Sequence, residues 1–208
     1  MNISAYMSCM KHLSICLLLC SGITAAAQTA SHAELLSALR GGGQVIVMRH
    51  AASPRAEPGR GSANPDNTAV ERQLDATGRH TAAAMGNALR ELKIPVGAVL
   101  SSPAYRALET VKLAGLPTPV THEELGDGGH SMQPVGGDRG NWLQQQVLKF
   151  PNSSNTVIVT HAPNLTAAFA EQAAGLADGE ALVFATNGKS GAKLLARIRI
   201  EEWPQLGR

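Results

Sequence analysis

Residues 44–50 read QVIVMRH, an apolar and β-branched run that ends in an arginine and a histidine. A run of this length and composition, with three glycines before it at 41–43, predicts a buried strand over 44–48. A second run of the same kind, TVIVT at 156–160, is followed directly by His161. The chain therefore has two expected buried strands that each lead into a histidine.

The sequence around these two strands alternates between helical and strand patterns. Helices are expected where apolar residues recur every three to four positions, or where a capping box or a proline marks a start. The expected helices lie over 31–40, 77–92, 103–114 and 138–150, and from Pro163 onward. Further strands are expected over 98–101, 119–121, 181–185 and 192–200. The last two strands flank an Asn-Gly pair at 187–188, which predicts a hairpin.

This alternation predicts an α/β fold with a mostly parallel central sheet, because parallel strands need helical crossovers between them. The carboxyl-terminal hairpin is expected to add antiparallel pairing at one side of the sheet. The length of 208 residues suits one domain. We therefore expect a single domain over 28–208, with its ligand site beyond the carboxyl ends of the strands.

The first 27 residues have the pattern of a secretory signal peptide. Lys11 precedes an apolar run over 13–23, and small residues lead to Ala27, after which we expect cleavage. The translation start is open among three methionines, Met1, Met7 and Met10. The mature chain is expected to be periplasmic or secreted, with no membrane span once the leader is removed.

Composition excludes several classes of chemistry for the mature chain. The three cysteines, Cys9, Cys16 and Cys20, all lie in the expected leader, so disulfides, zinc–thiolate sites and thiol nucleophiles are excluded. A formal net charge of +2 gives little support for a nucleic-acid partner. The chemistry is therefore expected to rest on histidine, arginine, hydroxyl groups and carboxylates.

Polar side chains follow three of the expected strands at the point where each strand ends. One strand leads to Arg49 and His50, another leads through two serines and a proline to Arg106, and the third leads to His161. The carboxyl ends of parallel strands meet at one edge of a sheet, so we expect these side chains to form a compact, positive pocket. Arginine donors and the amino terminus of a helix both suit an anion such as phosphate.

This pattern resembles the histidine phosphatase superfamily, in its phosphoglycerate-mutase-like branch 1. Four segments carry the resemblance, in the family's order and spacing: VMRHAAS at 47–53, LDATGR at 74–79, SSPAYRALET at 101–110 and VIVTHAP at 157–163. The match covers most of the mature chain. It implies a three-layer α/β/α sandwich of the phosphoglycerate-mutase-like type.

The resemblance implies that His50 is a nucleophile that carries a transient phosphohistidine. It also implies that Arg49, Arg106 and His161 hold the phosphoryl oxygens, and it puts Ser53 near a position that contacts phosphate in relatives. No metal and no cofactor are implied. The chemistry of the residues agrees with this, because a neutral imidazole is available as a nucleophile near pH 7.

A general acid is also needed, to protonate the leaving alkoxide. Many members of the family take a glutamate from a Leu-x-Glu setting just after a strand, whereas this chain has THEELGDG at 121–128. If the strand continues through the two glutamates, their side chains face opposite ways and only one enters the pocket. Glu124 is the preferred candidate over Glu123 and Asp127, and some relatives lack this acid altogether.

The expected function is that of an exported, metal-independent phosphomonoesterase of the histidine acid type. Its partner would be a small phosphomonoester, such as a sugar phosphate or a phosphorylated component of the cell envelope. Two alternatives stay open on the same fold, a phosphomutase and a non-catalytic binder of phosphorylated ligands. A metallohydrolase that uses His50 and His161 is disfavoured, because Arg49 would repel a cation. The loops over 51–70 and 122–137 are expected to border the pocket.

Overall fold

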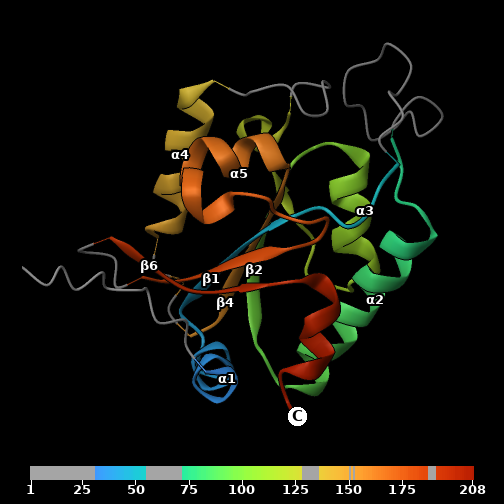
Figure 1. The fold of residues 1–208 in the computed structure, drawn as a ribbon, viewed down its shortest axis with the longest axis vertical. Helices are drawn as coiled ribbons and strands as arrows, with labels where there is room; N and C mark the ends of the chain where they lie inside the picture. Colours follow the sequence, from blue (N-terminus) through green and yellow to red (C-terminus); the bar gives the residue numbers. More distant parts are fainter. Residues whose placement is uncertain (1–30, 55–71, 128–135, 150, 152, 187–190) are drawn as a thin grey trace, which may run out of the picture.

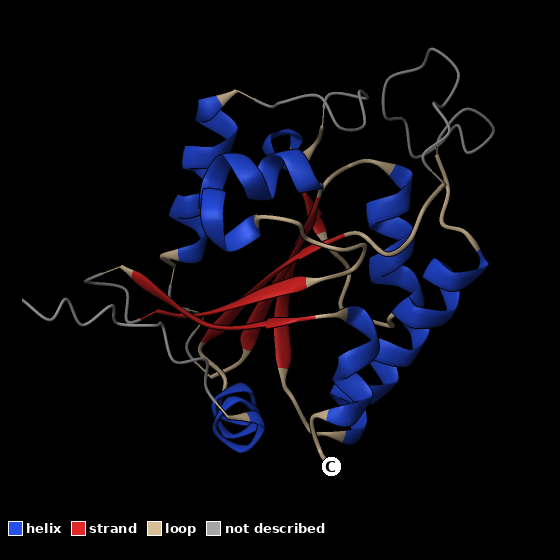
Figure 2. Cartoon of the chain, in the orientation of Figure 1, coloured by secondary structure: helices blue, strands red, loops and turns tan. Residues whose placement is uncertain are grey.

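A mixed sheet with the strand order β3-β2-β4-β1-β5-β6 runs through the middle of the protein (Figures 1 and 2). The computed structural model describes residues 31–54, 72–127, 136–149, 151, 153–186 and 191–208. The expected signal peptide over 1–27 and the Asn-Gly turn at 187–188 lie outside these residues. Residues 55–71 and 128–135, from the two loops expected at the pocket, also lie outside them.

Four neighbouring strands pair in parallel: β3 (Val120–Thr121), β2 (Val96–Ser101), β4 (Asn155–Thr160) and β1 (Gln44–Arg49). Two strands add antiparallel pairing beside β1: β5 (Ala181–Thr186) and β6 (Ala192–Ile198). The mostly parallel sheet and the antiparallel hairpin at one side are therefore confirmed. The last strand is shorter than predicted, because the chain turns into the 3-10 helix η3 (Ile200–Gln205), whose Trp203 is buried.

The α-helices of the described residues are α1 (His32–Gly41), α2 (Ala76–Glu91), α3 (Tyr105–Leu113), α4 (Gly137–Val147) and α5 (Ala162–Phe169). Two further 3-10 helices are η1 (Glu123–Leu125) and η2 (Ala170–Ala173). Figure 1 shows α4 and α5 together on one face of the sheet, with α1, α2, α3 and η3 on the other side. In the part of the chain that the structure describes, no helix is long and apolar enough to cross a membrane.

Alternate residues of β1 enter two separate hydrophobic cores. Val45 and Val47 pack with residues of α4 and α5, whereas Ile46 and Met48 pack with residues of α1, α2 and α3. All four side chains are buried, and each such burial stabilises the fold by about 1.5–3 kcal/mol. A strand that is buried on both faces requires a layer of helices on each side. The predicted α/β/α sandwich is therefore confirmed.

The amino terminus of α2 lies against the loop that follows β1, and this contact depends on a glycine. The Asp75 carboxylate caps the helix by accepting from the Gly78 backbone N–H at 2.7 Å. A Cβ at Gly78 would lie 2.0 Å from the Ala52 carbonyl oxygen, so no larger residue fits without a shift. The Asp75 N–H donates to the same oxygen at 3.1 Å. The LDATGR segment therefore anchors α2 to the residues that follow His50.

Candidate active site

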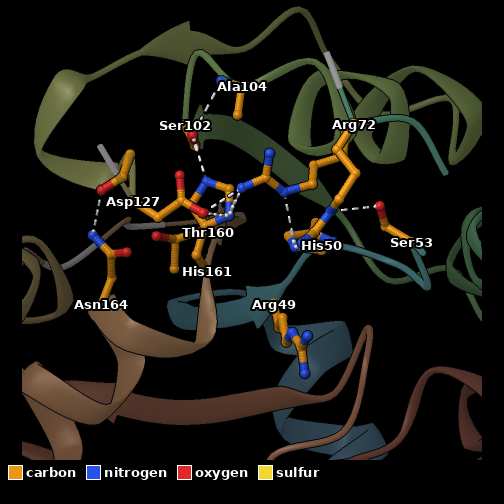
Figure 3. A network of polar contacts seen from close by, with 12 residues as sticks. Arg49, His50, Ser53, Arg72, Ser102, Ala104, Asp127, Thr160, His161 and Asn164 are labelled. Carbon is orange, nitrogen blue, oxygen red and sulfur yellow. Dashed lines mark hydrogen bonds and ion pairs between the residues drawn. The ribbon is translucent and has the colours of Figure 1, made fainter. Parts of the chain in front are cut away.

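The carboxyl ends of β1, β2 and β4 meet at one edge of the sheet. His50 continues the pairing beyond β1, because its N–H donates to the Thr160 carbonyl oxygen at 3.0 Å. Ser102 does the same beyond β2, with its N–H on the Val159 carbonyl oxygen at 2.9 Å. His161 follows β4 directly. The sheet itself therefore brings together side chains that are far apart in the sequence (Figure 3).

The His50 ring carries its proton on one nitrogen and its lone pair on the other. Its Nδ1 lies 2.8 Å from the Ala51 carbonyl oxygen, which only accepts, so the ring proton is on Nδ1. The other nitrogen, Nε2, accepts from Arg106 Nε at 3.2 Å and faces Arg72 Nη2 at 3.3 Å. The side chain is almost fully buried, with 2% of the residue exposed. The atom available for attack is therefore Nε2, with a guanidinium on each side of it.

Arg106 connects both histidines to an acidic side chain. Its Nη2 forms an ion pair with Asp127 and also donates to His161 Nδ1 at 3.0 Å. The first turn of α3 that carries Arg106 is joined to the segment after β1 through Thr110, whose Oγ1 donates to the Arg106 carbonyl oxygen at 2.8 Å and accepts from the Ala51 N–H at 3.1 Å. Arg106 is 3% exposed. Its guanidinium is therefore held from several directions at once.

His161 is oriented by a serine and by Arg106. A guanidinium only donates, so His161 Nδ1 accepts and its proton lies on Nε2, which donates to Ser102 Oγ at 2.7 Å. The Nδ1 atom is also 3.5 Å from Asp127 Oδ2. The rings of His50 and His161 meet edge to face, with centroids 5.2 Å apart. The two histidines therefore lie side by side in one buried site.

Burial and positive neighbours keep both histidines neutral. Burial lowers the pKa of His50 well below its usual value, and the nearby His161 and Arg106 lower it further, against the hydrogen bond to Ala51. Burial also lowers the pKa of His161, together with the charges of Arg106 and Arg72. A neutral imidazole at neutral pH is the form that a nucleophile requires.

These lowered pKa values predict that the protein loses stability in mild acid. Both pKa values are below the usual 6.5 of an unfolded chain, so near and below pH 6.5 the unfolded state binds more protons. The two neutral histidines therefore make their full contribution to the free energy of unfolding above pH 6.5. Below pH 6.5 the free energy of unfolding decreases by about 1.4 kcal/mol per pH unit for each histidine. Denaturant unfolding between pH 7.5 and 5.5 measures this slope. His161→Phe should reduce it and the exposed His80→Gln should not, whereas a flat profile would contradict the assignment.

Arg72 is a member of the site that the sequence analysis missed. Its Nε donates to Ser53 Oγ at 2.9 Å, and Ser53 in turn donates to the Gln73 carbonyl oxygen at 2.7 Å. Burial lowers the pKa of Arg72 to about 10, with a further contribution from Arg106, so it stays protonated at neutral pH. The available signal was an arginine two residues before the LDATGR segment. Ser53, expected near phosphate, thus holds Arg72.

Arg49 is buried, and its guanidinium is directed to the chain before β5. Its Nη2 forms an ion pair with Asp178 Oδ1 at 2.6 Å, and its Nη1 donates to the Leu176 carbonyl oxygen at 3.4 Å. Its charge also contributes to lowering the pKa of both His50 and His161. Of the three predicted phosphate-binding residues, the structure therefore brings Arg106 and His161 against His50, whereas Arg49 contacts Asp178.

The preferred acidic residue, Glu124, does not contribute its carboxylate to this cluster. The strand expected over 119–121 is present as β3 and ends at Thr121, where η1 follows, so the condition under which the two glutamates would alternate is not met. Glu124 is half-buried and presents its backbone oxygen to the Asn164 amide at 2.9 Å, while Glu123 is exposed. The acidic side chain within the cluster is instead Asp127, which is buried beside Arg106.

Among the described residues, no group of three or more histidine, cysteine or acidic side chains is placed to hold a metal ion. The charges nearest to His50 Nε2 are cationic, from Arg72 and Arg106. Such a site attracts an anion, and the planar guanidinium donors match the oxygens of a phosphoryl group.

The structure is thus that of an α/β protein with a buried cluster of two histidines and two arginines at the carboxyl ends of its parallel strands. A sequence model described as histidine phosphatase superfamily (branch 1) matches residues 45–127. That stretch contains His50, Arg106 and Asp127. The resemblance to this superfamily is therefore confirmed.

Solved structures with the same fold include three relatives at low sequence identity. The protein histidine phosphatase SixA in complex with tungstate has a TM-score of 0.55 at 20% identity, covering 76% of this chain and 98% of that chain. A putative phosphohistidine phosphatase SixA from Nakamurella multipartitia has a TM-score of 0.53 at 23% identity, covering 75% and 95%. A phosphoserine phosphatase mutant from Entamoeba histolytica, in complex with phosphoserine, has a TM-score of 0.54 at 14% identity, covering 76% and 98%. No curated protein sequence matches the chain.

Proposed function

We propose that this protein is a metal-independent phosphatase that hydrolyses a phosphomonoester through a phosphohistidine on His50. The observation that carries this proposal is the geometry at His50 Nε2. This atom carries the lone pair of the ring, the ring is neutral because burial lowers its pKa, and two guanidinium groups lie within 3.3 Å of the atom. A nucleophile between two phosphate-binding groups is what phosphoryl transfer requires.

The reaction would proceed in two steps. First, Nε2 forms a bond to phosphorus as the bond from phosphorus to the ester oxygen breaks, and the leaving oxygen takes a proton from solvent to depart as the alcohol. Second, water attacks phosphorus, the bond to Nε2 breaks, and inorganic phosphate leaves. Arg106 and Arg72 would stabilise the charge on the phosphoryl oxygens in both steps, and positioning and charge supply most of the acceleration in such reactions.

The known relatives support an oxyanion at this site. Tungstate, which is bound to SixA, is an oxyanion, and the phosphoserine phosphatase is in complex with a phosphomonoester. We propose a small phosphomonoester as the substrate here, with sugar phosphates and phosphorylated components of the cell envelope as the first classes to test.

The proposed function can be tested by measuring turnover of a panel of phosphomonoesters by the purified protein in the presence of EDTA. Turnover is expected to be the same with and without EDTA, because the cationic groups of the site are arginines. Loss of activity on chelation would contradict a metal-independent reaction. Tight phosphate binding without turnover of any ester would instead indicate a non-catalytic binder, and transfer to a second alcohol in preference to water would indicate a mutase.

We further propose that the mature protein is exported. The proposal rests on the leader pattern, with Lys11 before an apolar run and Ala27 at the expected cleavage point. Mass spectrometry of extracytoplasmic material from the producing cells is expected to find Gln28 at the amino terminus. An intact leader on cytoplasmic protein would contradict export.

A further inference from the structure

The turn over residues 124–126, which precedes Asp127, is held by the buried side-chain amide of Asn164. Asn164 lies in the first turn of α5, and its Nδ2 donates to the carbonyl oxygens of Glu124 and Gly126 at 2.9 and 3.1 Å. The whole residue is inaccessible to solvent. Figure 3 shows Asn164 beside this turn, on the side of the cluster that carries Asp127. The turn is therefore fixed to the helix that starts directly after His161.

Two further side chains hold the same turn. Thr160, the last residue of β4, donates from Oγ1 to the Leu125 carbonyl oxygen at 2.7 Å. Arg139, in α4, donates from Nη1 to the Gly126 carbonyl oxygen. Three successive carbonyl groups are thus bound by β4, α4 and α5, and the next residue in the chain is Asp127.

Apart from its two hydrogen bonds to Glu124 and Gly126, the buried amide of Asn164 contributes little to the stability of the fold. Its Oδ1 is buried and has no hydrogen-bond partner within the described ranges. A buried polar atom without a partner is unfavourable, so an apolar side chain would suit this position better if packing alone mattered. The contribution of the amide is therefore to the turn that it holds.

The fixed turn places the Asp127 carboxylate on one edge of the Arg106 guanidinium. That edge, at Nη2, pairs with Asp127, and the Nε edge of the same plane donates to His50 Nε2 at 3.2 Å. A guanidinium is planar and rigid, so fixing one edge fixes the direction of the others. The position of Asp127 consequently sets how Arg106 faces the reacting nitrogen.

We propose that Asp127, held by Asn164 and Thr160, is a positioning residue that orients Arg106 toward the phosphoryl group, and that it is not the proton donor of the reaction. This inference rests on the proposed phosphatase function. The Oδ2 atom of Asp127 already accepts from the Arg106 guanidinium, which suits orientation and opposes proton donation by that oxygen.

The dependence on leaving group distinguishes these two roles. Wild type and Asp127→Asn are compared on p-nitrophenyl phosphate, whose leaving group needs no proton, and on glycerol 2-phosphate, whose leaving group does. A positioning Asp127 acts on the phosphoryl group that both substrates share, so Asp127→Asn should lower kcat by the same factor on both, about 10²-fold. A loss of about 10²–10⁴ on glycerol 2-phosphate with a much smaller loss on the aryl ester would overturn the proposal.

A matched pair of buried asparagines tests the role of the turn. Asn155, at the start of β4 and away from the site, is also fully buried, and its Nδ2 donates to the carbonyl oxygens of Leu39 and Pro95 at 2.7 and 2.8 Å. Asn164→Ala and Asn155→Ala should both lower the thermal midpoint. Only Asn164→Ala should lower kcat, by roughly 10-fold or more and equally on the two substrates. Equal kcat in the two variants would overturn the proposal.

Failure of this inference differs from failure of the proposed function. If the proposed function is wrong, wild type shows no turnover of either substrate and no phosphate on His50, before any variant is compared. If only the inference is wrong, wild type is active and one of the two patterns that overturn it appears. Because Asp127→Asn and Asn164→Ala are independent changes, poor folding of one variant still leaves the other measurement.

Discussion

Replacement of His50 by alanine is expected to remove turnover, with a fall in kcat on the order of 10⁶-fold, as loss of a nucleophile causes in other hydrolases. The physical reason is that, in the proposed reaction, His50 Nε2 is the atom that forms the bond to phosphorus, while His161 lies beside it as a neighbouring polar group. Rapid acid-free quenching with ³²P-labelled substrate measures the covalent intermediate directly. Label is expected on wild type and none on His50→Ala.

Two controls separate the nucleophile from its surroundings. His161→Ala should keep some labelling and lose only about 10²–10³ in kcat, because it removes stabilisation of charge but leaves the attacking atom. His80→Ala changes an exposed histidine on α2 and should behave as wild type. Near-wild-type turnover by His50→Ala would exclude the proposed mechanism.

Replacement of Arg106 by alanine is expected to give the second-largest effect, a loss of about 10²–10³ in kcat. Arg106 is the group that contacts His50, His161 and Asp127 together, so its removal takes a donor from the phosphoryl group. It also leaves Asp127 buried without this counter-ion, which should lower the free energy of unfolding by about 3–5 kcal/mol.

Kinetics and unfolding measured on the same variants test both parts of this prediction. Arg106→Lys keeps the positive charge but loses the planar donors, so its kcat should lie between those of wild type and Arg106→Ala. Arg90→Ala removes an arginine from the last turn of α2 and serves as the control for charge alone. Equal activity of Arg106→Lys and wild type would show that the geometry of the guanidinium does not matter.

The principal parts of this site could be predicted from the sequence, because parallel strands bring their carboxyl ends together. β1 and β4 are apolar runs that are each followed directly by a histidine. Because the two strands are neighbours and parallel, the residues that follow them lie at the same edge of the sheet. The proximity of His50, Arg106 and His161 followed from this rule. The position of Gly78 at the start of α2 followed from its motif, and the structure supplies the reason in its close approach to Ala52.

The partners of the charged groups could not be predicted in the same way. The contact of Arg49 with Asp178 joins residues 129 positions apart (178 − 49), and the choice among nearby carboxylates depends on whether the chain after β3 stays extended. It turns into η1 instead, so Asp127 and not Glu124 reaches Arg106. Arg72 had no periodic signal, because its role arises from a side-chain contact with Ser53, 19 positions earlier in the sequence.

Hydrophobic periodicity and chain connectivity act locally and leave few topologies, so the strands, the helices and the edge of the sheet where the polar residues gather could all be inferred from the order of residues alone. The pairing of each guanidinium with a histidine, and the carboxylate that accompanies it, depend instead on the three-dimensional packing. Hydrogen bonds to buried charges depend on the direction of each donor and on differences of a few tenths of an ångström in the donor–acceptor distance. The packing of segments that are distant in the sequence sets these distances and directions.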